Sequence, residues 1–225
     1  MKAFFVTGTD TEVGKTFVSG ALLQQSVKRG KRAIGFKPVA SGCERTIEGL
    51  RNSDALTLQA SGEPVLKYEE VNPFSFEEAI APHIAAKRAQ TSIDVKRINQ
   101  AYLALTQKDA DILIVEGAGG WRLPLGNGQL MSEFVAQQQL PVVIVVGMKL
   151  GCLNHAKLTE EAILNDGLKV AGWVANHIQP DMPYLAENIA SLHEMMLSPC
   201  LGEMPWSDTG ESDASKLSLD WLCPQ

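Results

Sequence analysis

A lysine and a threonine follow two glycines near the start of the chain, in the order that a phosphate-binding loop requires. Gly8 ends an apolar run, and Gly14, Lys15 and Thr16 come after five intervening residues. Glycines let the backbone fold around an anion, the lysine neutralises the outer phosphates, and the threonine hydroxyl can hold magnesium. The usual pattern is one residue shorter. The spacing therefore indicates either a variant phosphate loop or an ordinary glycine-rich turn.

Two more charged side chains come directly after apolar runs and could complete a phosphate-transfer site. Lys37 follows residues 33–36, and Glu116 follows residues 111–115. An acid at the end of a buried strand commonly holds magnesium opposite a phosphate loop. Lys37 could equally be a solvated lysine at the end of a strand.

Asp54 admits two interpretations. It or Ser53 could cap a helix, because short polar side chains accept hydrogen bonds from the free N–H groups of a first turn. Alternatively, its carboxylate could join Thr16 and Glu116 as a magnesium ligand, since magnesium prefers oxygen ligands. With two lysines nearby, these groups describe phosphoryl transfer from a nucleoside triphosphate, in which catalysis is mainly positioning and charge neutralisation.

Short apolar runs alternate with helix-like patterns along the chain. Runs that predict buried strands lie at residues 2–7, 33–36, 111–115, 141–146, 170–175 and 201–204. Segments 43–52 and 61–82 indicate a polar loop and a long connection, and 217–222 indicates a short closing helix. The alternation predicts one α/β domain over residues 1–225, with a doubly wound, mostly parallel sheet of about six to seven strands and helices on both faces.

Parallel strands present their carboxyl ends at one edge of the sheet, where the ligands of such folds bind. The candidate side chains fall at strand ends or just beyond: Lys15, Lys37, Glu116, Lys149, Asn176, Pro205 and Trp206. We therefore expect them to converge. The chain has no Asn-Lys-x-Asp run of the kind that selects guanine, whereas the Asn176 amide could read an adenine edge.

A second helix start could also bind an anion. The turn Gly151–Asn154 leads into a helical pattern at 154–164. The amino end of a helix offers free N–H groups and a partial positive charge. Asn154 could instead act only as the cap of that helix.

Bulk properties narrow the class of protein. A net charge of −6 over 225 residues argues against a nucleic-acid or anionic-membrane partner. The first residues do not read as a signal peptide, and no apolar stretch is long enough to span a membrane. The four cysteines and four histidines lack metal or redox spacing. We expect a cytoplasmic protein with reduced thiols.

Six motifs follow one another along the chain: GTDTEVGKT at 8–16, GFKPVASG at 35–42, GLRNSD at 49–54, VEGAGGW at 115–121, GCLNH at 151–155 and GWVAN at 172–176. Together they resemble the dethiobiotin synthetase family, a branch of the P-loop NTPases, from residue 2 to about residue 206. The extra residue of the phosphate loop is itself part of the family pattern.

The resemblance implies an ATP-dependent ring-closing ligase of biotin biosynthesis. Such enzymes take 7,8-diaminopelargonate and CO2, form a carbamate on one amine and phosphorylate it with ATP. The second amine then attacks the mixed anhydride, which closes the ureido ring of dethiobiotin and releases phosphate. The resemblance also implies Mg2+ and a homodimer whose subunits share each active site.

Individual roles follow from the same resemblance. It assigns charge stabilisation in catalysis to Lys15 and Lys37, and magnesium to Thr16, Asp54 and Glu116. It assigns ATP to Glu12, Val13, Gly14, Lys15, Thr16, Phe17, Asp54, Glu116, Gly117, Ala118, Gly119, Asn176, His177, Met204, Pro205 and Trp206. It assigns the diamine to Thr11 and Ser41, and the carboxylate tail of the substrate to Gly151, Cys152, Leu153 and Asn154 of the other subunit. One position departs from the family, since Asn188 stands where a tyrosine assists that carboxylate.

Other functions stay open at this point. A nucleotide-switch ATPase of the partitioning type usually has a second lysine near the start of the loop, where this chain has Thr9, Asp10 and Thr11. Such ATPases often also have a membrane-binding tail, for which 217–222 is too short. The sequence does not distinguish a dethiobiotin synthetase from a paralogue with the same fold that acts on another small molecule. The lysines and carboxylates expected at one edge disfavour a non-enzymatic nucleotide-binding module.

Overall fold

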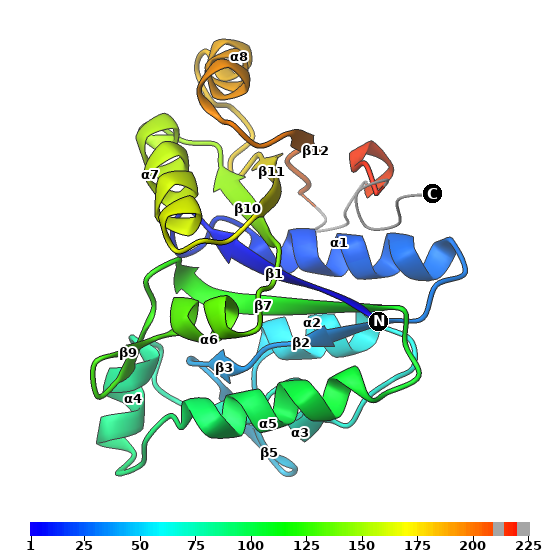
Figure 1. Ribbon diagram of the computed structural model, residues 1–225, viewed down its shortest axis with the longest axis vertical. Helices are drawn as coiled ribbons and strands as arrows, with labels where there is room; N and C mark the ends of the chain where they lie inside the picture. The colour runs from blue at the N-terminus through cyan, green and yellow to red at the C-terminus, as the bar shows by residue number, and fades with distance from the viewer. Residues whose placement is uncertain (209–213, 220–225) are drawn as a thin grey trace.

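A central sheet of six parallel strands organises the molecule (Figure 1). The computed structural model describes residues 1–208 and 214–219. The strands lie in the order β12-β11-β10-β1-β7-β2. Their bounds are β1 Lys2–Gly8, β2 Ala33–Phe36, β7 Ile112–Gly120, β10 Val142–Gly147, β11 Val170–Asn176 and β12 Cys200–Met204. The predicted α/β fold with a parallel sheet is confirmed.

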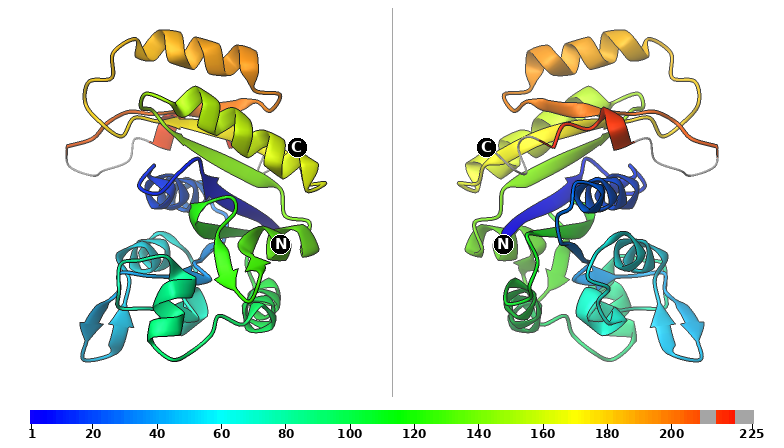
Figure 2. Two further views of the ribbon diagram at one scale, coloured as in Figure 1. Left: turned by 90° about the vertical axis from the view of Figure 1, so that its left-hand side faces the viewer. Right: turned by 90° about the vertical axis from the view of Figure 1, so that its right-hand side faces the viewer.

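Helices cover both faces of this sheet. Figure 2 shows α1 and α2 on one face and α5, α6 and α7 on the other, with α8 outside α7. The bounds are α1 Lys15–Lys28, α2 Ser53–Ser61, α3 Tyr68–Val71, α4 Pro82–Arg88, α5 Val95–Thr106, α6 Met131–Gln137, α7 Cys152–Asn165 and α8 Leu185–Met195. No helix within the described ranges combines the length and the apolar character that crossing a membrane would require.

Small elements replace several predicted loops. The polar segment 43–52 contains an antiparallel hairpin, β4 Glu44–Thr46 and β5 Gly49–Arg51. The connection 61–82 contains α3 and the short strand β6 Phe74–Ser75, which pairs with β3 Val39–Ala40. A further hairpin joins β8 Pro124–Gly126 to β9 Gln129–Leu130. These elements are too short to produce a recognisable hydrophobic period.

The predicted closing helix at 217–222 is wrong where it can be compared with the structure. A single 3-10 turn, Ala214–Lys216, precedes it, and residues 217–219 are not helical. Leu217 and Leu219 are buried, and the Ser218 N–H donates to the Leu201 carbonyl oxygen beside β12. Residues 220–222 lie outside the described residues.

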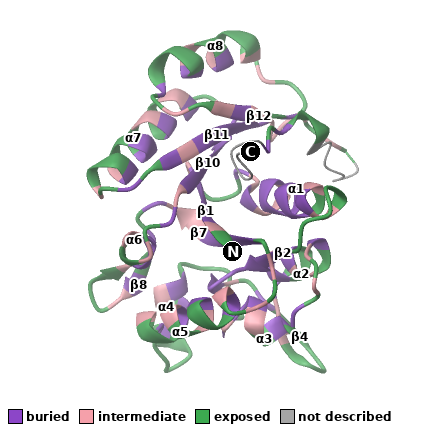
Figure 3. Ribbon diagram, turned by 45° about the vertical axis from the view of Figure 1, so that its right-hand side comes forward, coloured by how far each residue is buried: buried purple, intermediate pink, exposed green. Residues whose placement is uncertain are grey.

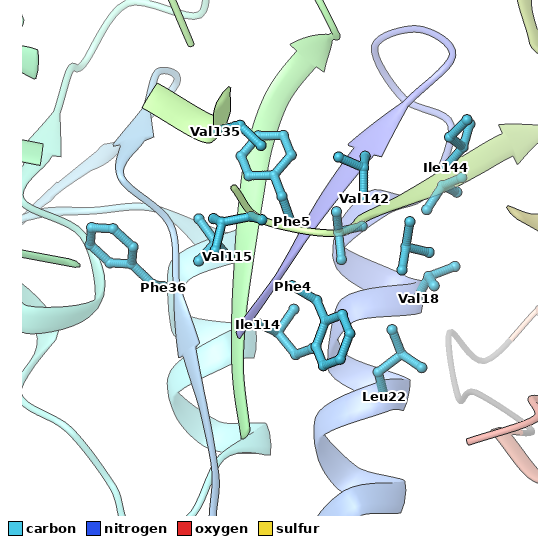
Figure 4. Packing of buried hydrophobic residues seen from close by; sticks show 14 of the residues in the cluster. Phe4, Phe5, Val18, Leu22, Phe36, Ile114, Val115, Val135, Val142 and Ile144 are labelled. Carbon is cyan, nitrogen blue, oxygen red and sulfur yellow. The ribbon is translucent and has the colours of Figure 1, made fainter. Parts of the chain in front are cut away.

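The core forms on both sides of β1 because its side chains alternate. Phe4 points toward Leu22 of α1, and Phe5 points the other way, toward Val135 of α6 (Figure 4). The strands are mostly buried, whereas α8 exposes its outer side (Figure 3). Burying each large apolar side chain contributes about 1.5–3 kcal/mol, so the sheet is a rigid base for the loops at its edge.

Strand register brings the predicted site residues to the same level. Phe36 of β2 pairs with Val115 of β7, and the next residue of β7, Glu116, pairs with Val6 of β1. Lys37 follows Phe36 directly, so it emerges beside Glu116. The expectation that β7 ends before Glu116 is wrong, because the strand continues to Gly120 with an irregularity opposite the end of β1.

Candidate functional site

The predicted phosphate loop connects β1 to α1. The helix begins at Lys15, directly after Gly14, whose φ of 85° lies in the left-handed region. A Cβ on Gly14 would overlap the Asn176 amide, so both the backbone conformation and this contact require glycine. The Lys15 ammonium donates to the Asp10 carbonyl oxygen at 2.9 Å, which folds the loop around its own lysine.

A cavity of about 370 Å³ adjoins this loop. It brings together loop residues, both predicted catalytic lysines and one of the predicted metal-binding carboxylates. Its lining residues are Thr11, Glu12, Gly14, Lys15, Thr16, Lys37, Ala40, Ser41, Asn52, Asp54, Ala118 and Gly119. Only Ala40 and Asn52 were not predicted from the sequence. The expected convergence at the carboxyl edge of the sheet is therefore confirmed for this half of the site.

Lys37 occupies the centre of a buried ion cluster. Its ammonium donates to Glu116 Oε1 at 2.5 Å and to Asp54 Oδ2 at 2.9 Å. It also donates to the Gly117 carbonyl oxygen at 3.1 Å. Thr16 Oγ1 donates to the same Glu116 oxygen at 2.8 Å. Lys37 is thus neither solvated nor free, and it links strands β2 and β7 to the start of α2.

The charge states follow from these contacts. Burial disfavours the charged form of Lys37, but Glu116 and Asp54 outweigh burial and raise the pKa of its ammonium. Burial likewise opposes ionisation of Asp54, but the Lys37 charge lowers the pKa of that carboxyl below its ordinary value. Lys15 is different, because burial and the neighbouring Lys37 charge lower its pKa to about 8. Lys37 is therefore a fixed cation, whereas the pKa of Lys15 is lowered to about 8.

The same cluster has the donor set for a divalent cation. Glu116 is fully buried, and its Oε2 has no hydrogen-bond partner in the described parts of the chain. An unpartnered buried carboxylate oxygen is costly unless a cation or water binds it. A hydroxyl from Thr16 and carboxylates from Asp54 and Glu116 are the hard oxygen ligands that magnesium takes. The residues present therefore fit this ion.

Asn52, rather than Ser53 or Asp54, caps α2. The Asn52 side-chain oxygen accepts from the Ala55 N–H at 3.2 Å, and the helix begins at Ser53. Both predicted caps were therefore wrong. Because Asn52, two residues before Asp54, provides the cap, the Asp54 carboxylate is free to contact Lys37.

A second cavity, of about 220 Å³, lies beside the first. Its lining residues are Glu12, Gly14, Phe17, Asn176, His177, Ile178, Pro205, Trp206 and Ser207. Glu12 and Gly14 line both cavities, so the two form one elongated site. The Asn176 amide nitrogen donates to the Val13 carbonyl oxygen at 2.8 Å, while its side-chain oxygen is buried without a partner in the described residues. That oxygen can accept a hydrogen bond from an exocyclic amine.

Two residues predicted to bind ATP, Val13 and Met204, have buried side chains and contribute to the site through their backbones only. Val13 is buried, and its side chain packs beneath Gly8 and Gly147. Met204 is also buried, and its carbonyl oxygen accepts from the His177 N–H at 2.9 Å. Their side chains therefore position the loops rather than contact a ligand.

The Gly151–Asn154 turn lies apart from both cavities. None of its residues lines either one, although the helix start predicted there exists. Gly151, with a φ of 94°, precedes α7, and no side chain caps the helix. The alternative that Asn154 is the cap is wrong, because Asn154 is the third residue of α7. The neighbouring Leu150 is 97% exposed.

Sequence reasoning missed the role of Asp10. Its Oδ1 accepts from the Thr11 N–H at 2.8 Å, and its Oδ2 accepts from Lys149 at 2.9 Å. The ion pair lowers the pKa of the Asp10 carboxyl. It also ties the phosphate loop to the segment before α7. Asp10 and Lys149 are 139 residues apart, so no local pattern indicates the pair.

Asn188, the position that departs from the family, lies in α8. Its amide donates to the Tyr184 carbonyl oxygen at 2.8 Å. This bond is internal to the first turn of the helix, and Asn188 lines neither cavity.

Comparison with known proteins gives close relatives over nearly the whole chain. A family model described as an AAA domain matches residues 2–213. The ATP-dependent dethiobiotin synthetase BioD of Cellvibrio japonicus is 51% identical over 219 residues, covering 97% of this chain and 96% of the relative. Its namesake from Pseudomonas aeruginosa is 48% identical over 220 residues, covering 98% and 96%. That from Vibrio vulnificus is 49% identical over 206 residues, covering 92% and 90%.

Solved structures with a similar fold are much more distant in sequence. The MinC:MinD cell division protein complex of Aquifex aeolicus matches with a TM-score of 0.59 at 13% identity, covering 93% of this chain and 83% of that one. The signal recognition particle receptor FtsY of Elizabethkingia anophelis matches with a TM-score of 0.51 at 17% identity, covering 96% and 61%. At these identities the likeness shows the fold alone.

Proposed function

The chain belongs to the ATP-dependent dethiobiotin synthetase family, and we propose that the two joined cavities are its active site. It is an ATP-dependent synthetase of biotin biosynthesis that acts on a small-molecule substrate. The observation that best supports the site is the buried Lys37 between Glu116 and Asp54, directly beside the phosphate loop. The partitioning-type alternative has only fold likeness in its favour, at 13% identity.

The proposed reaction runs through a carbamate. One amine of 7,8-diaminopelargonate adds to the carbon of CO2 and loses a proton, which gives a carbamate anion. A carbamate oxygen attacks the γ-phosphorus of ATP, and ADP leaves. The second amine attacks the carbonyl carbon of this mixed anhydride and loses a proton, the bond from that carbon to the phosphate oxygen breaks, and dethiobiotin and inorganic phosphate are released.

Lys37 and Lys15 stabilise the negative charge on the carbamate and on the transferred phosphoryl group during these reaction steps. The Lys37 ammonium is held by two carboxylates at the level where the transferred group passes. Lys15 lies in the phosphate loop and gains a full charge when phosphates approach, because anions favour its protonated form. Positioned charges of this kind supply most of the catalysis in phosphoryl transfer.

Thr16, Asp54 and Glu116 are the proposed magnesium ligands. When bound, the ion would neutralise charge on the β- and γ-phosphates. Lys37 already contacts both carboxylates, so the cluster is arranged around positive charge.

The remaining residues of the joined cavities divide between the two substrates. Thr11 and Ser41 line the larger cavity and bind the diamine, beside Ala118 and Gly119. Adenine occupies the smaller cavity, against Pro205 and Trp206. There the free Asn176 oxygen accepts from the adenine amine, which guanine lacks at that position.

The carboxylate tail of the substrate would be bound by a second subunit. The larger cavity is lined by the two lysines proposed for the reacting end, while the uncapped start of α7, whose free N–H groups could bind an anion, lies outside it. In a homodimer, Gly151–Asn154 of one subunit would bind the carboxylate of a substrate held by the other. The exposed Leu150 beside this turn would then be covered. Light scattering at assay concentration is expected to give a dimer, and a monomer with full activity would contradict the shared site.

An oxygen-labelling experiment tests the carbamate route. The protein is mixed with the diamine, ATP, magnesium and 18O-labelled bicarbonate, and quenched before the label exchanges with water. Phosphate carrying one 18O atom is expected, because a carbamate oxygen leaves with the phosphoryl group. Unlabelled phosphate formed together with dethiobiotin would exclude a phosphorylated carbamate.

A further inference from the structure

A buried tyrosine hydroxyl lies between two buried asparagines outside the catalytic set. Tyr68 Oη accepts from the Asn52 N–H at 2.8 Å and donates to Asn72 Oδ1 at 3.0 Å. All three residues are buried, and burial raises the pKa of the Tyr68 hydroxyl, so it stays protonated and can donate. These three residues are called the Tyr68 relay below.

One arm of the relay fixes the backbone of the catalytic lysine. Asn72 Nδ2 donates to the Lys37 carbonyl oxygen at 2.7 Å. The Lys37 N–H in turn donates to the Val71 carbonyl oxygen at 2.8 Å. Both polar groups of the Lys37 backbone are therefore held by the end of α3, rather than by a neighbouring strand of the main sheet.

The other arm fixes the carboxylate that faces this lysine. Asn52 caps α2, and its Nδ2 donates to the Ser41 carbonyl oxygen at 3.3 Å. Asp54 is the second residue of that helix and contacts the Lys37 ammonium at 2.9 Å. The Tyr68 hydroxyl thus joins the segment that carries Lys37 to the helix that carries Asp54.

The ring of Tyr68 is itself held in place. The Arg51 guanidinium lies 4.2 Å from its ring centroid, an attractive cation–π contact. Asn72 Oδ1 also accepts from Ser75 Oγ at 2.7 Å. A fully hydrogen-bonded buried network of this kind is rigid and has one arrangement.

We propose that the Tyr68 relay positions Lys37 and Asp54 for phosphoryl transfer, which makes Tyr68 a positioning residue of the reaction. The proposal rests on the proposed function of the joined cavities. Reacting groups must be placed within a fraction of an ångström, and a misplacement of about 1 Å can cost on the order of 100-fold in rate. Adenine binding is independent of the relay, because the smaller cavity is formed by the phosphate loop, α1 and the segments after β11 and β12.

The variant Tyr68→Phe removes the hydroxyl and keeps the ring. We expect kcat for dethiobiotin formation to fall about 10- to 100-fold. The KM for ATP and the calorimetric Kd for ADP are expected to stay within about twofold of the wild-type values. The reason is that the variant leaves intact the contacts that bind nucleotide equally in the ground state and the transition state.

Tyr102→Phe is the matched control. Tyr68 and Tyr102 are each 6% exposed, and the Tyr102 hydroxyl has no hydrogen-bond partner in the described ranges. Tyr102 lies in α5, away from both arms of the relay. Its variant should keep wild-type kcat, which separates the loss of the relay from the general loss of a tyrosine hydroxyl.

The variant Asn72→Ser removes the hydrogen bond to the Lys37 carbonyl oxygen, because the shorter side chain cannot reach that oxygen. It should give the same fall in kcat with unchanged nucleotide affinity. Wild-type kcat in folded Tyr68→Phe or Asn72→Ser, or an equal fall of kcat in Tyr102→Phe, would overturn the role of the relay. Such a result would leave the proposed function of the joined cavities unchanged. A wild-type protein that forms no dethiobiotin would overturn the proposed function, and the role of the relay with it.

Discussion

At the scale of single residues, the buried lysine of the ion cluster is the centre of the proposed site. Lys37 is 3% exposed and Glu116 is fully buried, and the Lys37 ammonium contacts Oε1 of the Glu116 carboxyl group. Removing one member of such a pair leaves an uncompensated charge, which typically costs about 3–5 kcal/mol. Even an isosteric change at either residue is therefore expected to lower the activity.

Lys37→Met should abolish most ring closure while nucleotide still binds. We expect dethiobiotin formation to fall about 100- to 1000-fold, the usual effect of removing one positioned electrostatic partner. ADP binding measured by calorimetry should persist, because Lys37 does not line the smaller cavity, which is the one proposed for adenine. The exposed Lys31→Met is the control for loss of a lysine charge. Wild-type turnover by Lys37→Met would remove Lys37 from the catalytic set.

The lowered pKa of Lys15 predicts that nucleotide binding takes up protons. Its pKa is lowered to about 8, so near pH 8 about half of the free protein carries a neutral Lys15. Bound phosphates restore the ammonium, so binding takes up on the order of half a proton per site at pH 8 and very little near pH 6.5. Calorimetry of ATP binding in buffers of different ionisation enthalpy measures this uptake. The same uptake in Lys15→Met would contradict the assignment.

At the scale of elements, the long apolar strands and the phosphate loop were predictable, while caps and short strands were not. Runs such as 111–115 and 141–146 are short and rich in valine and isoleucine, which favours a buried strand over a helix. The Asn52 cap was missed because three adjacent polar residues can each cap a helix, and only the backbone geometry selects one. The continuation of β7 through its glycines was missed because glycine is depleted in strands and weakens them.

The loop between α8 and β12 depends on one buried carboxylate. Glu160 of α7 accepts from the N–H groups of Leu197 and Ser198 and from the Ser198 hydroxyl, at 2.6–3.1 Å. Burial opposes its ionisation, but these hydrogen bonds outweigh burial and lower the pKa of its carboxyl. A lowered folded-state pKa stabilises the fold above the unfolded pKa, and this contribution is lost as the pH falls through the folded value.

Glu160→Gln should therefore lower the free energy of unfolding by about 1.5–3 kcal/mol at pH 7, the usual value of hydrogen bonds to a charged group. The difference from wild type should shrink toward pH 4. Urea unfolding at the two pH values measures both effects. Glu161→Gln, at an exposed neighbouring position, should change stability by less than about 0.5 kcal/mol. A Glu160→Gln effect that is equal at both pH values would contradict the charge argument.

At the scale of the whole molecule, the order of the strands makes one site from distant segments. The phosphate loop and Lys37 follow strands β1 and β2, Glu116 lies within β7, and Asn176 is the last residue of β11. The carboxyl ends of these four strands share one edge (Figure 1). That convergence could be predicted from the sequence, because parallel strands leave no other arrangement. The contacts of Asp10 with Lys149, and of Tyr68 with both asparagines, could not be predicted, because they depend on loop geometry in three dimensions.

The most direct test of the proposed function is the dependence of ATP turnover on the diamine. Purified protein is incubated with ATP, magnesium and bicarbonate, with and without 7,8-diaminopelargonate, and phosphate and dethiobiotin are measured together. We expect one phosphate per dethiobiotin when the diamine is present, and almost no phosphate without it. Phosphate release that ignores the diamine, with no dethiobiotin formed, would contradict the assignment of this site to ring closure.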